Sequence, residues 1–168
     1  MAIYTYALLQ IAILAYAVLG GVFLAFSDFI MRSLTLSHRT GGVEAMQTIN
    51  REVFRGVFMV LFLGMTAVSL LTIYYAAFAH SGLTRTLIAM SGLVYLLGCF
   101  GVTIVCNVPM NNILARMDLA SDTTLNYWAD VYLPRWTFWN TIRTLACCLS
   151  SALLLFGFTR MLSSVAQG

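Results

Sequence analysis

The sequence predicts an all-α integral membrane protein: a four-helix bundle with short interfacial helices in its first and third loops. Of the 168 residues, 61% are hydrophobic and only 9% are charged, whereas soluble domains carry roughly 25% charged residues. Four apolar runs are also long enough to cross a bilayer, which takes about 20 residues. A chain this apolar, with a mean hydropathy of +0.89, cannot cover its own surface with polar groups, so lipid must be its outer solvent.

The expected spans lie at about residues 4–29, 53–79, 84–108 and 136–161, within a single transmembrane domain of residues 1–168. The first apolar run has no basic segment before it and no small-residue cleavage site after it, so we expect a retained helix and not a signal peptide. Residues 80–82 leave room only for a tight turn between the second and third spans. The two longer connections therefore share the opposite membrane surface.

Each long connection contains a predicted short helix. In the first, residues 40–42 (Thr-Gly-Gly) break the chain, and a helix runs from Val43 into the second span. In the second, Ser121 is a typical N-cap residue, and a helix runs from it towards Pro134. That proline permits a kink where the chain enters the fourth span.

The distribution of arginine predicts the orientation. The chain has no lysine, and its arginines are scattered among apolar runs, which argues against a nucleic-acid partner. The long-loop side carries Arg32, Arg39, Arg51, Arg55, Arg116 and Arg135, and the other side carries Arg85 and Arg160. By the positive-inside rule we expect a multi-pass protein of the cell (inner) membrane, with the long loops cytoplasmic and both termini outside.

Cysteine and histidine usage argues against a cofactor. Cys99, Cys106, Cys147 and Cys148 all lie in apolar stretches without a C-x-x-C motif, which favours helix packing over thiol oxidoreductase chemistry. The spans contain no histidine, which excludes bis-histidine haem ligation within the membrane. No clustered ligand set suggests a metal. We therefore expect no metal and no cofactor.

Polar residues gather where all four spans meet the long-loop side. They are Asp28; Asn50, Arg51 and Glu52; Asn107, Asn111 and Asn112; and Tyr132, Trp136, Trp139, Asn140 and Arg143. Arg143 lies about two turns inside the boundary, where a lipid-facing arginine would cost up to roughly 3 kcal/mol. It should therefore face the bundle and find a carboxylate or carbonyl, and Asp28 and Glu52 are the candidate acids.

Three of these features have two interpretations. An Asp28–Arg143 pair could be purely structural or part of a ligand pocket. The residues Trp128, Tyr132, Trp136 and Trp139 could form an interfacial belt or stack on a substrate. Asn107, which precedes Val108-Pro109, could simply end the third helix.

The same residues carry a resemblance to a known family. The sequence contains GGVFLAFSDFIMRSL, AMQTINREVF, GVTIVCNVPMNNILA and YWADVYLPRWTFWNTIRT. These segments, from Gly20 to about Thr144, resemble the anthrone-oxygenase-like family of small four-helix membrane proteins. The most specific motifs are N-V-P-x-N-N from Asn107 and W-x-x-W-N-x-x-R from Trp136. The resemblance implies oxidation of a polyketide anthrone to an anthraquinone by O₂ without metal or flavin, although many members have no assigned function.

The family supplies no established catalytic set, so we infer roles from chemistry. A base must remove an acidic C–H proton, and donors must hold the resulting oxyanion. We assign Asp28 or Glu52 as the base and Arg143, Asn107 and Asn140 as the oxyanion donors. The aromatic residues Tyr132, Trp136 and Trp139 would stack on a flat hydrophobic substrate. The remaining expected substrate-binding residues are Asn50, Arg51, Asn111 and Asn112.

Two other function classes are compatible with a small polar cluster inside a membrane bundle. The chain could be a small non-catalytic subunit that binds a lipid, quinone or pigment, or that assembles as a homo-oligomer or with a larger membrane complex. Isolation of the protein in mild detergent distinguishes this subunit from an enzyme, because a subunit of a larger complex would co-purify with stoichiometric partners. A transporter is disfavoured, since the second to fourth spans lack an acidic residue deep in the membrane.

Overall fold

The computed structural model describes residues 2–119 and 121–166, and the side chains of residues 4–119 and 121–164. It confirms the all-α membrane bundle, with no strand in the described part of the chain. Helix one consists of α1 (Ala2–Ala25), a π-helical segment (Phe26–Ile30) and α2 (Met31–Thr35). The second long element comprises α3 (Gly41–Glu52), a 3-10 turn (Val53–Arg55) and α4 (Val57–Ala79).

The other two long helices also contain π-helical segments. Helix three comprises α5 (Gly82–Tyr95), π-helical segments Leu96–Gly101 and Thr103–Asn107, and α6 (Val108–Leu114). Helix four comprises α7 (Asp122–Tyr127), a π-helical segment (Trp128–Tyr132) and α8 (Leu133–Ala166). The expected N-cap is present, since the Ser121 side chain accepts a hydrogen bond from the backbone N–H of Thr123.

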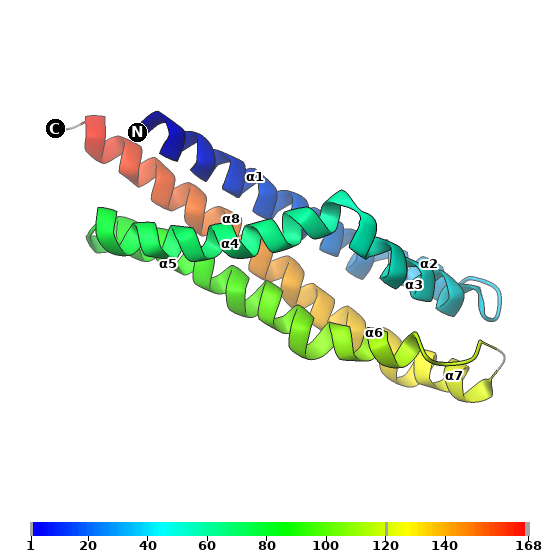
Figure 1. The fold of residues 1–168 in the computed structure, drawn as a ribbon. Coiled ribbons are helices and arrows are strands. Elements are labelled where there is room, and N and C mark those ends of the chain that lie inside the picture. The colour runs from blue at the N-terminus through cyan, green and yellow to red at the C-terminus, as the bar shows by residue number, and fades with distance from the viewer. Residues whose placement is uncertain (1, 120, 167–168) are drawn as a thin grey trace.

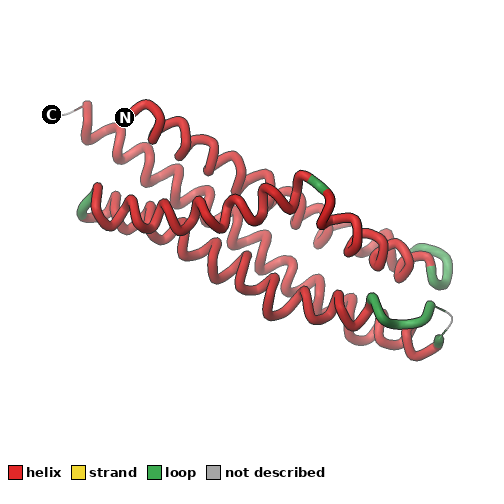
Figure 2. The backbone as a smooth tube through the Cα atoms, in the orientation of Figure 1, coloured by secondary structure: helices red, strands yellow, loops and turns green. Residues whose placement is uncertain are grey.

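The helices pack side by side, and the two ends of the chain lie together at one end of the bundle (Figure 1). Helix four is central, because α8 packs on both α1 and α5, and α5 also packs on α4. Loops are confined to the ends of the bundle and to one break at Gly56 (Figure 2). The elements α2, α3, α6 and α7 gather at the end opposite the termini.

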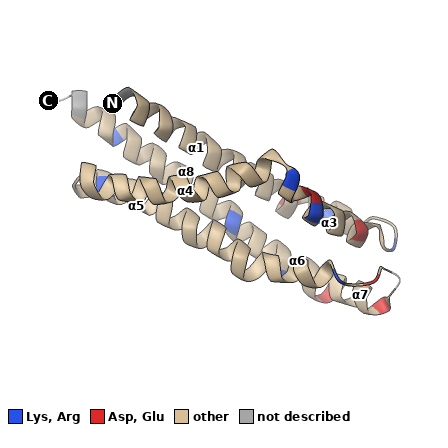
Figure 3. Ribbon diagram, in the orientation of Figure 1, with Lys and Arg blue, Asp and Glu red and all other residues tan. Residues whose placement is uncertain are grey.

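The bundle is longer than a membrane is thick. Helix four runs without a break over 43 residues from Asp122 to Ser164, which is about 65 Å at 1.5 Å per residue. A bilayer core measures about 30 Å, so roughly half of this helix lies beyond it. Charged residues concentrate at the α3 and α7 end (Figure 3), which places that end outside the apolar core. The helices therefore extend past the spans expected from hydropathy alone.

Buried apolar residues form two separate clusters along the bundle. The membrane core contains Tyr16, Leu19, Phe62, Tyr95 and Leu154 among others. The outer core contains Met31, Val43, Met46, Leu114, Trp128, Tyr132 and Trp136. Large apolar side chains on the outside, such as Leu8, Val60 and Leu97, face lipid.

The two prolines do not end the helices that contain them. Proline lacks an N–H, and its ring clashes with the carbonyl four residues earlier. Those carbonyls belong to Val105 and Asp130, and each lies in a π-helical segment, where the turn is wider. The interpretation that Asn107 merely ends helix three is therefore wrong, because the helix continues past Pro109 to Leu114.

Candidate functional site

Arg143 on α8 faces the bundle interior, as expected, and its side chain is only 6% exposed. Its Nη2 donates to Asn140 Oδ1 at 2.7 Å, and its Nη1 donates to Thr103 Oγ1 at 3.3 Å. The guanidinium carbon lies 4.3 Å from the ring centre of Phe23 and 5.2 Å from that of Trp136. These ring faces and neutral oxygens hold the charge in place.

The expected pairing of Arg143 with Asp28 or Glu52 is wrong. Among residues whose side chains are described, the ion pair joins Glu52 to Arg55, and no carboxylate lies within 4.0 Å of Arg143. The Nε of Arg143 has no hydrogen-bond partner either. Arg143 is therefore a buried cation without a counter-ion in the described part of the protein.

Asn140 connects this cation to helix one. It is fully buried, and its Nδ2 donates to the carbonyl of Phe23 at 2.6 Å and to Ser27 Oγ at 2.7 Å. Its Oδ1 accepts from Arg143. Thr141 Oγ1 also forms a hydrogen bond with Ser27 Oγ, at 3.0 Å. We call Ser27, Thr103, Asn107, Asn140 and Arg143 the polar layer, since they lie between the membrane core and the outer core.

Asparagines on helix three bind the start of helix four. Asn107 is fully buried and donates to the carbonyl of Trp136 at 3.3 Å, while its Oδ1 has no partner. Asn111 Oδ1 accepts from Tyr132 Oη at 2.7 Å and from Trp136 Nε1 at 2.9 Å. Asn50 donates to Tyr132 Oη at 3.3 Å. Polar groups of all four long elements thus bond helix four between Tyr132 and Arg143, over about three turns, but the second element reaches only Tyr132 and not the polar layer.

Three aromatic residues stack in a column, which we call the aromatic column. Trp128 and Tyr132 lie 5.3 Å apart, and Tyr132 and Trp136 lie 6.2 Å apart, with interplanar angles of 18° in both pairs. All three are buried, so the interpretation as a lipid-facing belt is wrong for them. Their i, i+4 spacing puts them on the helix face that packs in the outer core. Trp139 lies apart from the column, half-buried, with its ring edge-on to Phe138.

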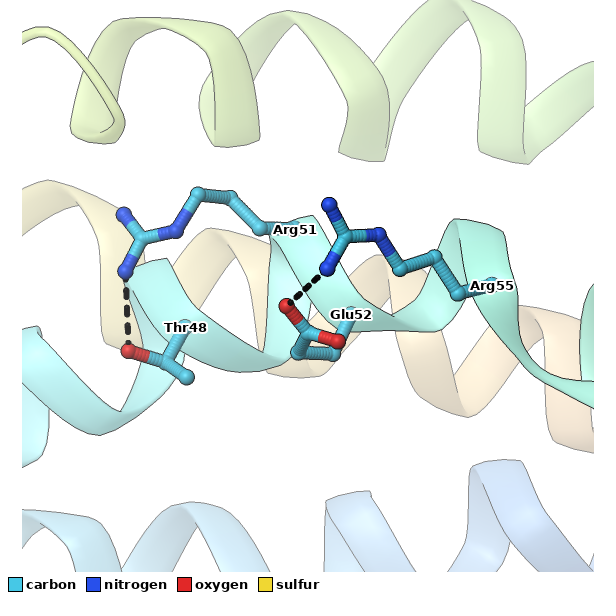
Figure 4. A network of polar contacts seen from close by, with 4 residues as sticks. All are labelled: Thr48, Arg51, Glu52 and Arg55. Atoms are coloured by element: carbon cyan, nitrogen blue, oxygen red, sulfur yellow. Dashed lines mark hydrogen bonds and ion pairs between the residues drawn. The ribbon is translucent and has the colours of Figure 1, made fainter.

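Several expected site residues lie outside the polar layer. Glu52 is exposed and binds Arg55 at 3.3 Å, and Arg51 is exposed and binds Thr48 at 3.0 Å (Figure 4). Both contacts join residues three apart on one helical stretch, so they form on its solvent face. Asn112 is also exposed, because the inward face of helix three is occupied by Asn107 and Asn111.

Asp28 lies in an open groove between helix one and helix four. The groove is shallow and open to the outside, with a volume of about 660 Å³. Its polar lining consists of Ser27, Asp28, Arg32, Thr35, Thr137 and Thr141, and its apolar lining includes Leu133 and Phe138. Ser27 belongs to both the groove and the polar layer. The groove is thus one hydrogen bond from Asn140 and two from Arg143.

Ser27 belongs to the polar residues at the long-loop end of the first span, but sequence reasoning assigned it no site role and did not single out Thr141. Small hydroxyl residues are common in helices, and their spacing carries no strong signal. Thr103 had a weak signal, since it precedes Asn107 by one turn. No group of three or more His, Cys, Asp or Glu side chains within the described residues could hold a metal.

One comparison with known proteins gave a match. A family model described as anthrone oxygenase matches residues 51–153, more than half of the chain. The match runs from the end of α3 to the middle of α8, and so includes Asn107, Asn111, Trp136, Asn140 and Arg143. No curated protein and no solved structure matches the chain.

Proposed function

This chain is a membrane protein of the anthrone oxygenase family, and on that premise we propose that it oxidises a flat aromatic ketone of the anthrone type with O₂, without a metal or flavin. One observation carries the proposal. A buried guanidinium without a carboxylate partner is hydrogen-bonded through Asn140 to Ser27, which lines the groove. The described residues leave a positive charge uncompensated two hydrogen bonds from an open groove.

The missing counter-ion is what such a substrate supplies. Burying a charge in a membrane protein is expensive unless an opposite charge or strong acceptors accompany it. An anthrone that loses its acidic C–H proton becomes an enolate with negative charge on oxygen. Binding of that anion beside the polar layer would offset the charge of Arg143, so the site favours the deprotonated substrate over the neutral one.

Ser27 is the proposed contact between the groove and the enolate oxygen. Its hydroxyl accepts from Asn140 and is hydrogen-bonded to Thr141. The single proton of Thr141 also bonds the Thr137 carbonyl at 2.9 Å, and a carbonyl can only accept. When Thr141 donates to that carbonyl, the Ser27 O–H donates either to Thr141 Oγ1 or to a ligand in the groove. The bonds from Arg143 to Asn140 and from Asn140 to Ser27 polarise that donor.

Asp28 is the proposed general base. It is exposed and lines the groove beside Ser27. It takes a proton from the methylene carbon, and the resulting enolate gives one electron to O₂. The radical pair combines into a peroxide at that carbon, which regains a proton and loses water to leave a carbonyl. Overall, one anthrone and one O₂ give one anthraquinone and one water. Glu52 does not line the groove, because it lies on the surface with Arg55.

The test is oxidation of 1,8-dihydroxyanthrone by the purified protein in mild detergent. The reaction rate is measured from the uptake of O₂ and from the absorbance of the anthraquinone product. Asp28→Asn should lower kcat by about 10²–10⁴-fold, as expected for loss of a general base. Ser27→Ala should lower it by about 10²–10³-fold, as expected for loss of an oxyanion donor. Glu52→Gln is the matched acid control and should leave kcat unchanged.

Two results would overturn the proposal. One is a folded Asp28→Asn protein that oxidises the anthrone as fast as wild type. The other is a wild-type protein no faster than detergent alone. Stoichiometric co-purification of other membrane proteins, together with the second result, would instead support a non-catalytic subunit.

We also propose the orientation given by the positive-inside rule, with the α3 and α7 end of the bundle in the cytoplasm and both termini outside. Arg32, Arg39, Arg51, Arg55, Arg116 and Arg135 belong to that end. In this orientation the groove opens at the cytoplasmic leaflet, where an apolar aromatic substrate can enter from the lipid.

A further inference from the structure

Two thiols meet in the membrane core, below the polar layer. Cys99 lies in the π-helical segment Leu96–Gly101 and Cys147 lies on α8. Their sulfur atoms are 3.4 Å apart, with the Cys147 thiol donating to Cys99 Sγ. Both side chains are fully buried, and neither is part of a disulfide. The proposed oxygenase mechanism uses neither residue.

Small neighbouring residues hold the two backbones close together. A Cβ atom placed on Gly98 would lie 2.7 Å from the Cβ of Ala146, so helices three and four touch one residue before each cysteine. Helix one closes the third side, since a Cβ on Gly20 would lie 3.2 Å from the Cβ of Cys147. Small residues permit such close packing of membrane helices. The thiols are therefore held face to face.

The thiol pair lies one helical turn from the cation of the polar layer. Cys147 follows Arg143 by four residues, and Thr103 follows Cys99 by four. Arg143 and Thr103 are themselves hydrogen-bonded. Four residues of helix rise about 6 Å, so the thiol pair and the Arg143–Thr103 hydrogen bond join the same two helices one turn apart.

We propose that Cys99 and Cys147 form an oxidisable dithiol, which an organic hydroperoxide converts to a disulfide between helices three and four. One sulfur attacks the peroxide, the O–O bond breaks, and a sulfenic acid and an alcohol form. The second thiol then attacks the sulfenic sulfur and releases water. Overall, two thiols and one hydroperoxide give one disulfide, one alcohol and one water. The sulfurs close from 3.4 Å to about 2.05 Å.

The experiment treats two double variants with cumene hydroperoxide, which partitions into detergent micelles. Cys106→Ser/Cys148→Ser retains only the buried pair, and Cys99→Ser/Cys147→Ser retains only the other two thiols. After denaturation, free thiols are counted with a maleimide-polymer reagent, and peptides are examined by mass spectrometry. The first variant should lose both thiols together, yield a linked peptide containing Cys99 and Cys147, and regain both thiols with dithiothreitol. The second should yield no linked peptide.

Two outcomes would contradict the proposed oxidation of Cys99 and Cys147 to a disulfide. In one, both thiols of the first variant survive a hydroperoxide concentration that oxidises exposed Cys148 in the second. In the other, a single thiol is oxidised irreversibly without a linked peptide. The wild-type protein, examined by the same peptide analysis, provides the answer if the first variant does not fold. The added reagent supplies the peroxide, so the result does not depend on oxygenase activity.

Discussion

Arg143 illustrates how a membrane bundle can hold an arginine without an acid. Its donors reach two neutral side-chain oxygens, and two aromatic faces cover its plane. Arginine suits this arrangement better than lysine, because its planar charge stacks on rings and is weakly hydrated. Asn140 is the central residue, since it binds Arg143 with its oxygen and helix one with its nitrogen.

Asn140→Leu should destabilise the protein by about 1–3 kcal/mol. The substitution keeps the side chain close to its original size but leaves an Arg143 donor buried without a partner and removes a bond to the Phe23 carbonyl, and one unsatisfied buried group costs about 1–3 kcal/mol. Thermal unfolding in detergent measures the effect. Asn112→Leu is the matched control and should change stability little, because Asn112 is exposed. Equal effects of the two substitutions would contradict the bridging role of Asn140.

At this scale the sequence predicts contacts along a helix better than contacts across helices. The spacing of Trp128, Tyr132 and Trp136 correctly places them on one face, because helical periodicity fixes that relation. It does not give the rotation of a neighbouring helix. Ser27 faces Asn140, whereas the adjacent Asp28 is exposed. Both lie in a π-helical segment, which changes the direction of side chains around the helix axis from that of a regular α-helix.

At the scale of elements, the π-helical segments Phe26–Ile30 and Thr103–Asn107 contain residues of the polar layer, and Trp128–Tyr132 contains two rings of the aromatic column. A π-helical turn inserts an extra residue and shifts every later side chain around the helix axis. Such segments depend on tertiary packing and have no reliable sequence signal beyond the prolines that follow two of them. This is why the sequence predicts the four helices, and a kink at Pro134, but leaves open whether helix three continues past Pro109.

The element α3 is fixed to the bundle by contacts that composition does not indicate. Gln47 Nε2 donates to the carbonyls of Leu114 at 2.8 Å and Met117 at 3.2 Å, and so ties α3 to the end of helix three. Gly42 lies against the backbone carbonyl of Leu34. A Cβ atom placed on Gly42 would lie 3.3 Å from the ring of Trp128. The α2–α3 turn therefore closes over one end of the aromatic column.

Gly42→Ala should lower the free energy of unfolding by about 1–3 kcal/mol, the usual cost of overpacking. The new methyl group would meet the backbone carbonyl of Leu34, which cannot rotate away as a side chain could. Gly41→Ala is the matched control, since its nearest neighbour would be Ser37 Cβ at an ordinary 3.6 Å. Chemical or thermal unfolding of the two variants checks this, and an unchanged stability for Gly42→Ala would contradict the close packing.

At the scale of the molecule, the polar layer separates two apolar cores with different solvents. The membrane core has lipid outside it, and the outer core lies within helices that extend beyond the bilayer. Hydropathy detects the first core well, because its residues are apolar all round the helix. It cannot reveal the second, since α3 and α7 contain polar faces typical of any surface helix.

The orientation of the whole bundle is testable because the chain has no lysine. Ser81→Lys adds a single side-chain amine in the exposed turn between α4 and α5, and Thr123→Lys adds one on the exposed face of α7. If the α7 end is cytoplasmic, a membrane-impermeant amine reagent should label the Ser81→Lys protein in intact cells and the Thr123→Lys protein only in inside-out vesicles. Peptide mass spectrometry distinguishes either site from the amino terminus. Labelling of the Thr123→Lys protein in intact cells would contradict the proposed orientation. The groove would then lie at the outer leaflet.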